Sequence, residues 1–164
     1  MTDPRWAIKE ALKDSFKKEK VKVVLAEYGP VANDILSICK SLNLPMIVHF
    51  HGYDASVSEV LKANDNYKEV FEYATSIVVV SKVMLDKLLS LGCPKDKLIL
   101  NHCAPNDAFH KLTPTMEDET LIGIGRFTDK KAPYYTILAF KEVVKKIPNA
   151  KLKLAGDGIL FNTC

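Results

Sequence analysis

A short loop that combines glycine with basic residues carries the strongest chemical signal in the sequence. Gly125 and Arg126 follow an apolar run, and Lys130 and Lys131 precede a segment with helical spacing. Glycine lets a backbone approach a ligand closely, Arg offers a forked pair of donors, Lys offers a point charge, and a helix amino terminus favours anions. The loop therefore predicts a diphosphate site. A solvated strand-to-helix loop with surface cations is the alternative interpretation.

Other polar residues and glycines stand where further apolar runs end. Ligands of open parallel sheets bind beyond the carboxyl ends of the strands, so we expect these residues to line one cleft. They are Glu27, His51, Gly52, Asp54, Ser81, Gly156 and Gly158. Structural roles compete with ligand binding, since Glu27 also suits a simple turn, Ser81 a helix cap, and the last two glycines a turn.

His49 and His51 raise the question of a metal ion. Alternate residues of a strand share one face, so both imidazoles can reach the same ion. Asp54, His102 and His110 would complete such a site only through tertiary contacts. We expect no metal, and we interpret His49 as a histidine packed in the core.

The elements that position these residues alternate between short apolar strands and helical segments. The predicted strands are 21–26, 45–50, 77–80, 97–100, 121–125 and 151–155, and the predicted helices are 4–20, 31–42, 56–74, the stretch between Ser81 and Gly92, and 134–146. The strand 77–80 is apolar throughout, which predicts burial on both of its faces. The alternation is typical of an α/β fold with helices on both sides of a parallel sheet.

The alternation is interrupted between residues 105 and 120. This stretch contains Pro105, Pro114 and the acidic run 117–119, and its composition suits a linker. It separates a Rossmann-like region, 1–104, from a single strand–helix–strand unit, 121–164. One such unit cannot bury both faces of its own sheet, so we expect it to lean on the first region or on further chain.

Composition excludes several classes of function. The chain has 164 residues, 48% hydrophobic and 26% charged, which is enough apolar material for a core, and its net charge of +3 disfavours a nucleic-acid binder. No apolar stretch approaches the roughly 20 residues that span a bilayer, and the first residues do not resemble a signal peptide, so we expect a cytoplasmic protein. The cysteines are scattered, which favours buried free thiols over disulfides or zinc ligands. They are Cys39, Cys93, Cys103 and Cys164.

Taken in order, the motifs resemble a known family. An HGxD strand end, a VVVS strand, a linker, a GRFxxKKAP loop and a GDG strand end follow one another between about Val23 and Gly158. This series resembles the family 4 group of glycosyltransferases with the GT-B fold. The resemblance implies two Rossmann-like domains, both incomplete: residues 1–104 are then part of the acceptor-side domain, and 121–164 begin the nucleotide-sugar-binding domain.

The resemblance also implies an activity. A retaining hexosyltransferase-type enzyme would move a sugar from a nucleotide-sugar to a saccharide or lipid-linked acceptor, in polysaccharide or cell-envelope synthesis. It would use no metal or other cofactor, and peripheral contact with the inner face of a membrane is left open.

Individual roles follow from the matched motifs. Arg126 and Lys131 would hold the diphosphate and stabilise the departing nucleoside diphosphate, with Lys130 as a substitute candidate. His51 matches the cleft histidine that hydrogen-bonds the donor sugar near its reacting carbon. Glu27 would lie toward the acceptor. Ser81 would line the cleft, and Gly156 and Gly158 would lie beside the nucleotide.

The sequence also departs from the family. The glycine-rich loop of the first domain and a carboxyl-terminal pair of glutamates are absent, and Ala132-Pro133 replaces a frequent glycine. We therefore expect a fragment that transfers little sugar by itself and self-associates through exposed sheet edges. The alternative is a catalytically inactive remnant or interaction module of the same fold. A phosphate-binding module of receiver or reductase type fits less well, because neither an acidic pocket nor GxGxxG follows the first strand.

Overall fold

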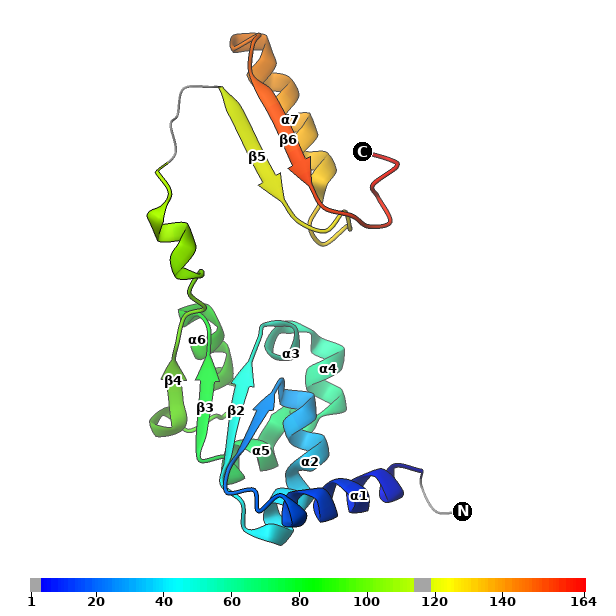
Figure 1. Cartoon of the computed structure of the whole chain (residues 1–164), viewed down its shortest axis with the longest axis vertical. Coiled ribbons are helices and arrows are strands. Elements are labelled where there is room, and N and C mark those ends of the chain that lie inside the picture. Colours follow the sequence, from blue (N-terminus) through cyan, green and yellow to red (C-terminus); the bar gives the residue numbers. More distant parts are fainter. Residues whose placement is uncertain (1–3, 114–118) are drawn as a thin grey trace. The chain divides into compact units, whose positions relative to one another are not determined.

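The computed structural model describes residues 4–113 and 119–164 (Figure 1). The chain forms two compact units, which we call unit 1 (residues 1–105) and unit 2 (residues 106–164). No helix within the described residues is both long and apolar enough to cross a bilayer.

Unit 1 contains four parallel strands in the order β1-β2-β3-β4 (Figure 1). Its elements are α1 (Pro4–Lys18), β1 (Val24–Glu27), α2 (Gly29–Leu42), β2 (Met46–Phe50), α3 (Tyr53–Ser56), α4 (Ser58–Ala63), η1 (Asp65–Tyr67), α5 (Lys68–Tyr73), β3 (Ser76–Val79), α6 (Lys82–Ser90), η2 (Lys95–Lys97) and β4 (Leu98–Leu100). All four strands predicted in this part of the chain are present. The predicted cap at Ser81 is confirmed, because its Oγ accepts a hydrogen bond from the Met84 backbone N–H at 3.2 Å.

The helices of unit 1 pack on one face of the sheet. Alternate strand residues such as Ala26, Val48 and Val79 are buried, and they join residues of α2, α5 and α6 in one core. On the opposite face, Leu25 is exposed and Val78 is half-buried. Because each right-handed crossover moves one strand further in the same direction, all crossovers reach the same face. The prediction of helices on both faces is therefore wrong for the described residues, and so is burial of both faces of 77–80.

In place of the predicted helix 56–74, the chain forms the last residue of α3, followed by α4, η1 and α5. The break occurs where Asp65, Asn66 and Tyr67 adopt positive φ angles of 46°, 51° and 62°. This left-handed turn directs Tyr67 into the core, where its hydroxyl donates a hydrogen bond to the Asp54 carbonyl oxygen at 3.0 Å. Burial, together with the nearby Asp54 charge, raises the pKa of Tyr67. The hydroxyl therefore stays protonated.

Unit 2 is built on a parallel pair of strands connected by a helix. Its elements are η3 (Asp107–Lys111), β5 (Thr120–Ile124), α7 (Pro133–Lys146) and β6 (Lys151–Ala155). The predicted strand–helix–strand unit is confirmed. Phe127 is buried and packs edge-to-face against Phe161, whereas Ile124 is 85% exposed. Within the predicted linker, residues 114–118, including Pro114 and part of the acidic run, lie outside the described residues.

The cysteines divide into two classes. Cys39 and Cys93 are buried free thiols, as predicted, whereas Cys103 and Cys164 are exposed. The prediction of burial is therefore wrong for the last two, which lie beyond the core of unit 1. Burial raises the pKa of the Cys39 thiol and raises that of Cys93 to about 11.

Candidate functional site

The glycine and basic loop of unit 2 connects β5 to α7. It turns tightly, because the backbone N–H groups of Lys131 and Ala132 both donate to the Thr128 carbonyl oxygen, at 2.9 and 2.8 Å. Ala132 adopts a positive φ of 45°, and Pro133 then begins α7, where a missing N–H costs nothing. The loop therefore leads directly into a helix amino terminus.

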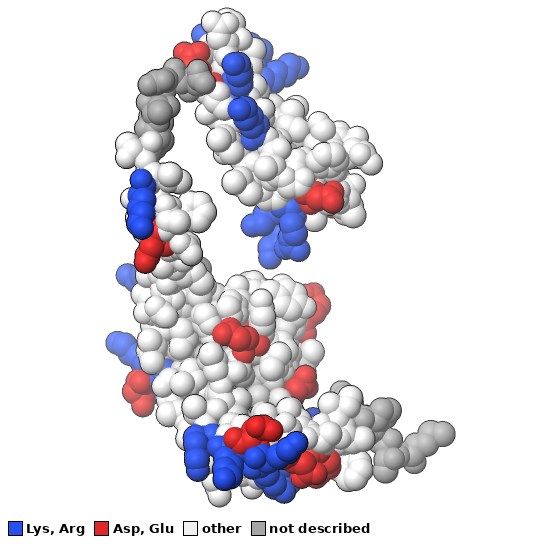
Figure 2. Space-filling model, in the orientation of Figure 1, with Lys and Arg blue, Asp and Glu red and all other residues white. Residues whose placement is uncertain are grey.

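A cavity of about 130 Å³ opens at this loop, and its lining includes Gly125, Arg126 and Lys131. Both of the cations that the sequence assigns to a diphosphate thus reach one pocket, and Lys130 is exposed beside it. A Cβ added at Gly125 would meet nothing within 4 Å, so the backbone there faces open space. Figure 2 shows basic side chains gathered at the end of unit 2 to which β5 leads. The pocket suits an anion.

The two glycines after β6 pack closely against the backbone of this loop. A Cβ at Gly156 would lie 1.8 Å from the Gly125 carbonyl oxygen, and one at Gly158 would lie 2.4 Å from that of Phe127. The Asp157 carboxylate accepts a hydrogen bond from the Gly158 N–H at 2.7 Å, so Asp157 orders this turn, as predicted. Close backbone packing thus accounts for both glycines, and their contact with a nucleotide stays a prediction.

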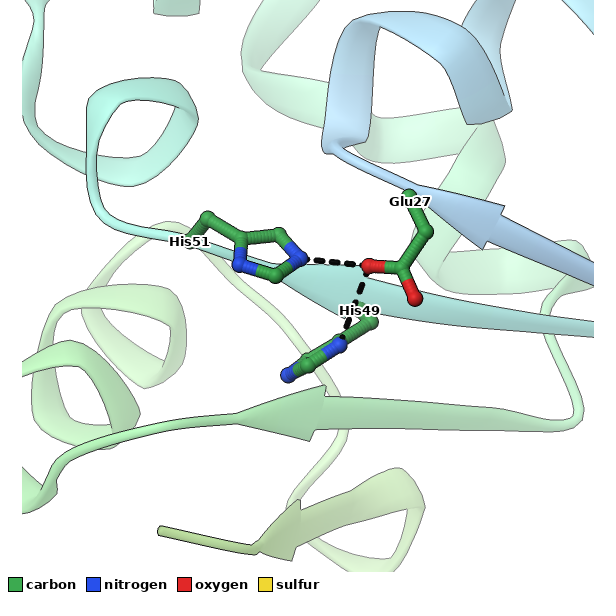
Figure 3. Close-up of side chains that lie close together, drawn as sticks. All are labelled: Glu27, His49 and His51. Atoms are coloured by element: carbon green, nitrogen blue, oxygen red, sulfur yellow. Dashed lines mark hydrogen bonds and ion pairs between the residues drawn. The ribbon is translucent and has the colours of Figure 1, made fainter. Parts of the chain in front are cut away.

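In unit 1, three side chains converge at the carboxyl ends of β1 and β2 (Figure 3). Glu27 is the register partner of His49, and His51 lies two residues further on, so all three share one face. Glu27 Oε2 accepts hydrogen bonds from His49 Nδ1, at 3.1 Å, and from His51 Nε2. The His51 ring also packs against that of Tyr28, with ring centroids 4.5 Å apart and the ring planes tilted by 37°. The rings are therefore held in place from several sides.

The hydrogen bond from His51 holds the pKa of Glu27 below its ordinary value; partial desolvation opposes this effect, and the charges of His49 and His51 add to it. His49 Nε2 is buried without a hydrogen-bond partner among the described residues. When His49 is neutral, its single ring proton therefore belongs on Nδ1, where Glu27 accepts it.

None of the metal ligands that the sequence suggested beside the two histidines joins this cluster. His102 Nδ1 donates to the Val80 carbonyl oxygen at 2.9 Å, and His110 belongs to η3 of unit 2. Asp54 is fully buried, and its carboxylate accepts hydrogen bonds from the backbone N–H groups of Gly29 and His51, at 2.9 and 3.0 Å. Asp54 thus has no exposed surface for a substrate, and we assign it a positioning role in place of the predicted contact.

Glu27 is the ligand-type residue whose place beside both histidines the sequence did not reveal. Its donor atom and those of His49 and His51 lie within 4.8 Å of one another. The sequence indicated only that these residues stand at the ends of two consecutive strands, where alternate positions share one face. The expectation of no metal does not take this carboxylate into account.

Gly52 and Ser81 line a second cavity in unit 1, of about 320 Å³. Gly52 has a φ of 102°, which glycine adopts without strain, and precedes α3. The lining also includes the apolar side chains of Ala55, Val83 and Met84. Gly52 and Ser81 therefore do line a cavity, and the binding of a ligand there stays a prediction.

The sequence is similar to two known proteins that are described as glycosyltransferases. The chain is 51% identical over 41 residues, a quarter of its length, to an uncharacterised glycosyltransferase of Methanocaldococcus jannaschii, and covers 10% of that protein. It is 23% identical over 148 residues, 85% of its length, to the putative colanic acid biosynthesis glycosyltransferase WcaL of Escherichia coli K12, and covers 36% of it. No protein-family model matches the sequence.

Two solved structures are similar in fold. Anabaena HepE, crystallised in complex with UDP, superposes with a TM-score of 0.74 at 12% identity over 96% of this chain. A co-structure of Staphylococcus aureus MnaA with UDP gives a TM-score of 0.50 at 12% identity over 94% of the chain. The chain spans 45% of each of these two proteins. The predicted α/β fold of GT-B type is confirmed.

Proposed function

We propose that the chain belongs to a retaining glycosyltransferase of the family 4 group, and that the loop of residues 125–131 binds the diphosphate of a nucleotide-sugar. One observation carries the proposal: the cavity at the end of β5 is lined by Gly125 together with Arg126 and Lys131. The glycosyltransferase relatives support the reaction class, and the UDP bound to HepE supports a uridine nucleotide. WcaL, named for colanic acid biosynthesis, supports a saccharide or lipid-linked acceptor in polysaccharide synthesis.

The two cations have a defined chemical task in this proposal. When the bond between the sugar and its phosphate breaks, negative charge grows on the departing diphosphate. The forked guanidinium of Arg126 and the ammonium of Lys131 stabilise that charge as it develops, in a pocket that already holds them. The diphosphate site then needs no metal ion of its own. Lys130, exposed beside the pocket, adds a further positive charge.

His51 is assigned to the donor sugar by its position in the HGxD motif. Its Nε2 is engaged by Glu27, so Nδ1 is the ring atom that remains for a sugar hydroxyl. Glu27 then orients His51, and its half-exposed carboxylate lies on the side that we assign to the acceptor. A lipid-linked acceptor would bring this cytoplasmic enzyme to the surface of a membrane.

Calorimetric titration of the chain with UDP tests the diphosphate assignment. Each charge-assisted contact contributes about 1.5 to 3 kcal/mol, so Arg126→Ala and Lys131→Ala should each weaken UDP binding about tenfold or more. Gly125→Ala should also weaken it without loss of stability, because its new Cβ meets only open space in the free protein.

Lys141→Ala is the matched control, since Lys141 is an exposed lysine of α7 that does not line the cavity. Its affinity for UDP should equal that of the unaltered chain. If Arg126→Ala and Lys131→Ala both bound UDP as tightly as this control, the diphosphate assignment would be wrong.

A further inference from the structure

We infer that Glu27, His49 and His51 form a binding site for a divalent transition-metal ion, with Zn²⁺ as the expected occupant. One donor atom from each residue lies within 4.8 Å of the other two. The site belongs to unit 1 and is built from residues other than those that line the diphosphate pocket. Glu27 and His51 also have roles in the proposed function, but the inference rests on the geometry of the three side chains and not on that function.

The backbone fixes the three side chains on one side of the sheet. Glu27 and His49 are register partners on neighbouring parallel strands, and His51 follows on the same face of β2 (Figure 3). The two imidazole rings lie with their centroids 4.2 Å apart, and the Tyr28 ring supports His51 from another side. Ligands that are held in this way by strands lose little freedom when an ion binds.

The donor set selects the class of ion. Two imidazoles and one carboxylate suit zinc and its first-row neighbours, whereas Mg²⁺ and Ca²⁺ take oxygen ligands. Zinc binds these atoms at about 2.0 to 2.2 Å, so three donor atoms that share one ion must lie closer together than the 4.8 Å that bounds this cluster, which small side-chain adjustments permit. The Glu27 and His51 side chains are 50% and 28% exposed, so an ion can enter from solvent and a water molecule can fill a fourth position.

Metal binding changes where the ring protons lie. In the metal-free site, His49 Nδ1 and His51 Nε2 both face Glu27 Oε2. An ion bound by these nitrogens moves the proton of each neutral ring to the other nitrogen. For His49 that nitrogen is Nε2, which is buried without a partner among the described residues, and this cost makes His49 the weaker of the two imidazole ligands.

Titration with ZnCl₂ tests the site. The chain should carry Cys103→Ser and Cys164→Ser, because these exposed thiols would bind zinc themselves. We expect a single equivalent of zinc to bind. Glu27→Gln, His49→Ala and His51→Ala should each lower the affinity for zinc by more than about tenfold. Loss of a residue that only hydrogen-bonds to a ligand already costs about tenfold, and loss of the ligand itself should cost more. The loss should be larger for His51→Ala than for His49→Ala.

His110→Ala, which removes an exposed histidine of unit 2, should bind zinc like the parent chain. X-ray absorption of the zinc-loaded parent chain needs no substitution in the site, and it should show only nitrogen and oxygen neighbours, including two imidazoles. The inference would be overturned if no stoichiometric zinc site were found, if all three site variants bound zinc as tightly as the parent chain, or if the zinc shell lacked two imidazoles. UDP titration of the same variants in the absence of zinc reports on the other pocket alone.

Discussion

At the scale of single residues, Asp54 shows what a motif leaves open. The HGxD pattern places an acidic residue a few positions after a strand end, and the sequence therefore predicts contact with substrate. In the fold, the carboxylate turns inward and accepts hydrogen bonds from two backbone N–H groups, one of which belongs to a residue 25 positions earlier. The direction of the side chain depends on that distant donor, and local sequence carries no information about it.

Replacement of this carboxylate should destabilise the fold. Asp54→Ala removes two hydrogen bonds to a buried charged group and leaves two backbone donors without partners, so we expect a loss of about 3 kcal/mol or more. Urea unfolding followed by circular dichroism measures this change. Asp86→Ala, at an exposed position of α6, is the control and should stay within about 0.5 kcal/mol of the unaltered chain. Equal unfolding midpoints for the two variants would contradict the positioning role.

Glu27 shows a different limit of the sequence. Its type and its place at a strand end identified it as a candidate, but its pairing with His49 depends on which strands are neighbours and in which register. Both are properties of the tertiary structure, which a local sequence pattern does not reveal. The loop that carries Arg126 and Lys131 is different, because the residues that line its cavity lie close together in the chain around one strand end. Local pattern was sufficient to bring them together.

At the scale of elements, apolar runs and glycine or proline breaks predicted the order of strands and most helices. The exception is the stretch 56–74, where the chain turns through three left-handed residues instead of continuing one helix. Such conformations are costly for residues other than glycine, and no local pattern calls for them. Burial of Tyr67 against the core compensates for the cost, and that burial becomes apparent only when α2 and β2 are in place.

The amino terminus of α2 is packed against this buried tyrosine. A Cβ at Gly29 would lie 2.6 Å from a ring carbon of Phe50 and 2.7 Å from one of Tyr67. Gly29→Ala should therefore destabilise the protein by about 1 to 3 kcal/mol through overpacking. Helix propensity alone predicts the opposite sign, a gain of up to about 1 kcal/mol.

Thermal unfolding of Gly29→Ala beside Gly125→Ala separates the two effects. The second substitution adds the same methyl group where it meets nothing, so its melting temperature should equal that of the unaltered chain. A Gly29→Ala variant that melted at or above the temperature of that control would show that the ring contacts yield easily.

At the scale of the whole molecule, the alternation of elements predicted the α/β class, but it did not predict whether helices cover one face of the sheet or both. An apolar strand such as 77–80 is compatible with helices on one face or on both, and strand order makes the difference. Here the order is sequential, so the crossovers share one face. Leu25, on the other face, is 57% exposed.

The core of the described residues is concentrated in one unit. Its cluster extends from Val24 to Cys93, entirely within residues 1–105. We expect a chain of residues 1–105 to fold by itself and to unfold cooperatively in urea. Thiol labelling near neutral pH should modify Cys103 quickly and spare Cys39 and Cys93, because both are buried and the pKa of Cys93 is raised to about 11. Rapid labelling of all three thiols would show that this unit needs more of the chain.

The sequential strand order also bears on how the sheet is assembled in time. Each of β2, β3 and β4 pairs with the strand that precedes it in the chain, so no strand has to be inserted between two others. During synthesis, each new strand and its helix can dock on an edge that is already complete. Each loop that closes is a single crossover between consecutive strands, which limits the entropy lost in each step and favours rapid, vectorial folding from the amino terminus.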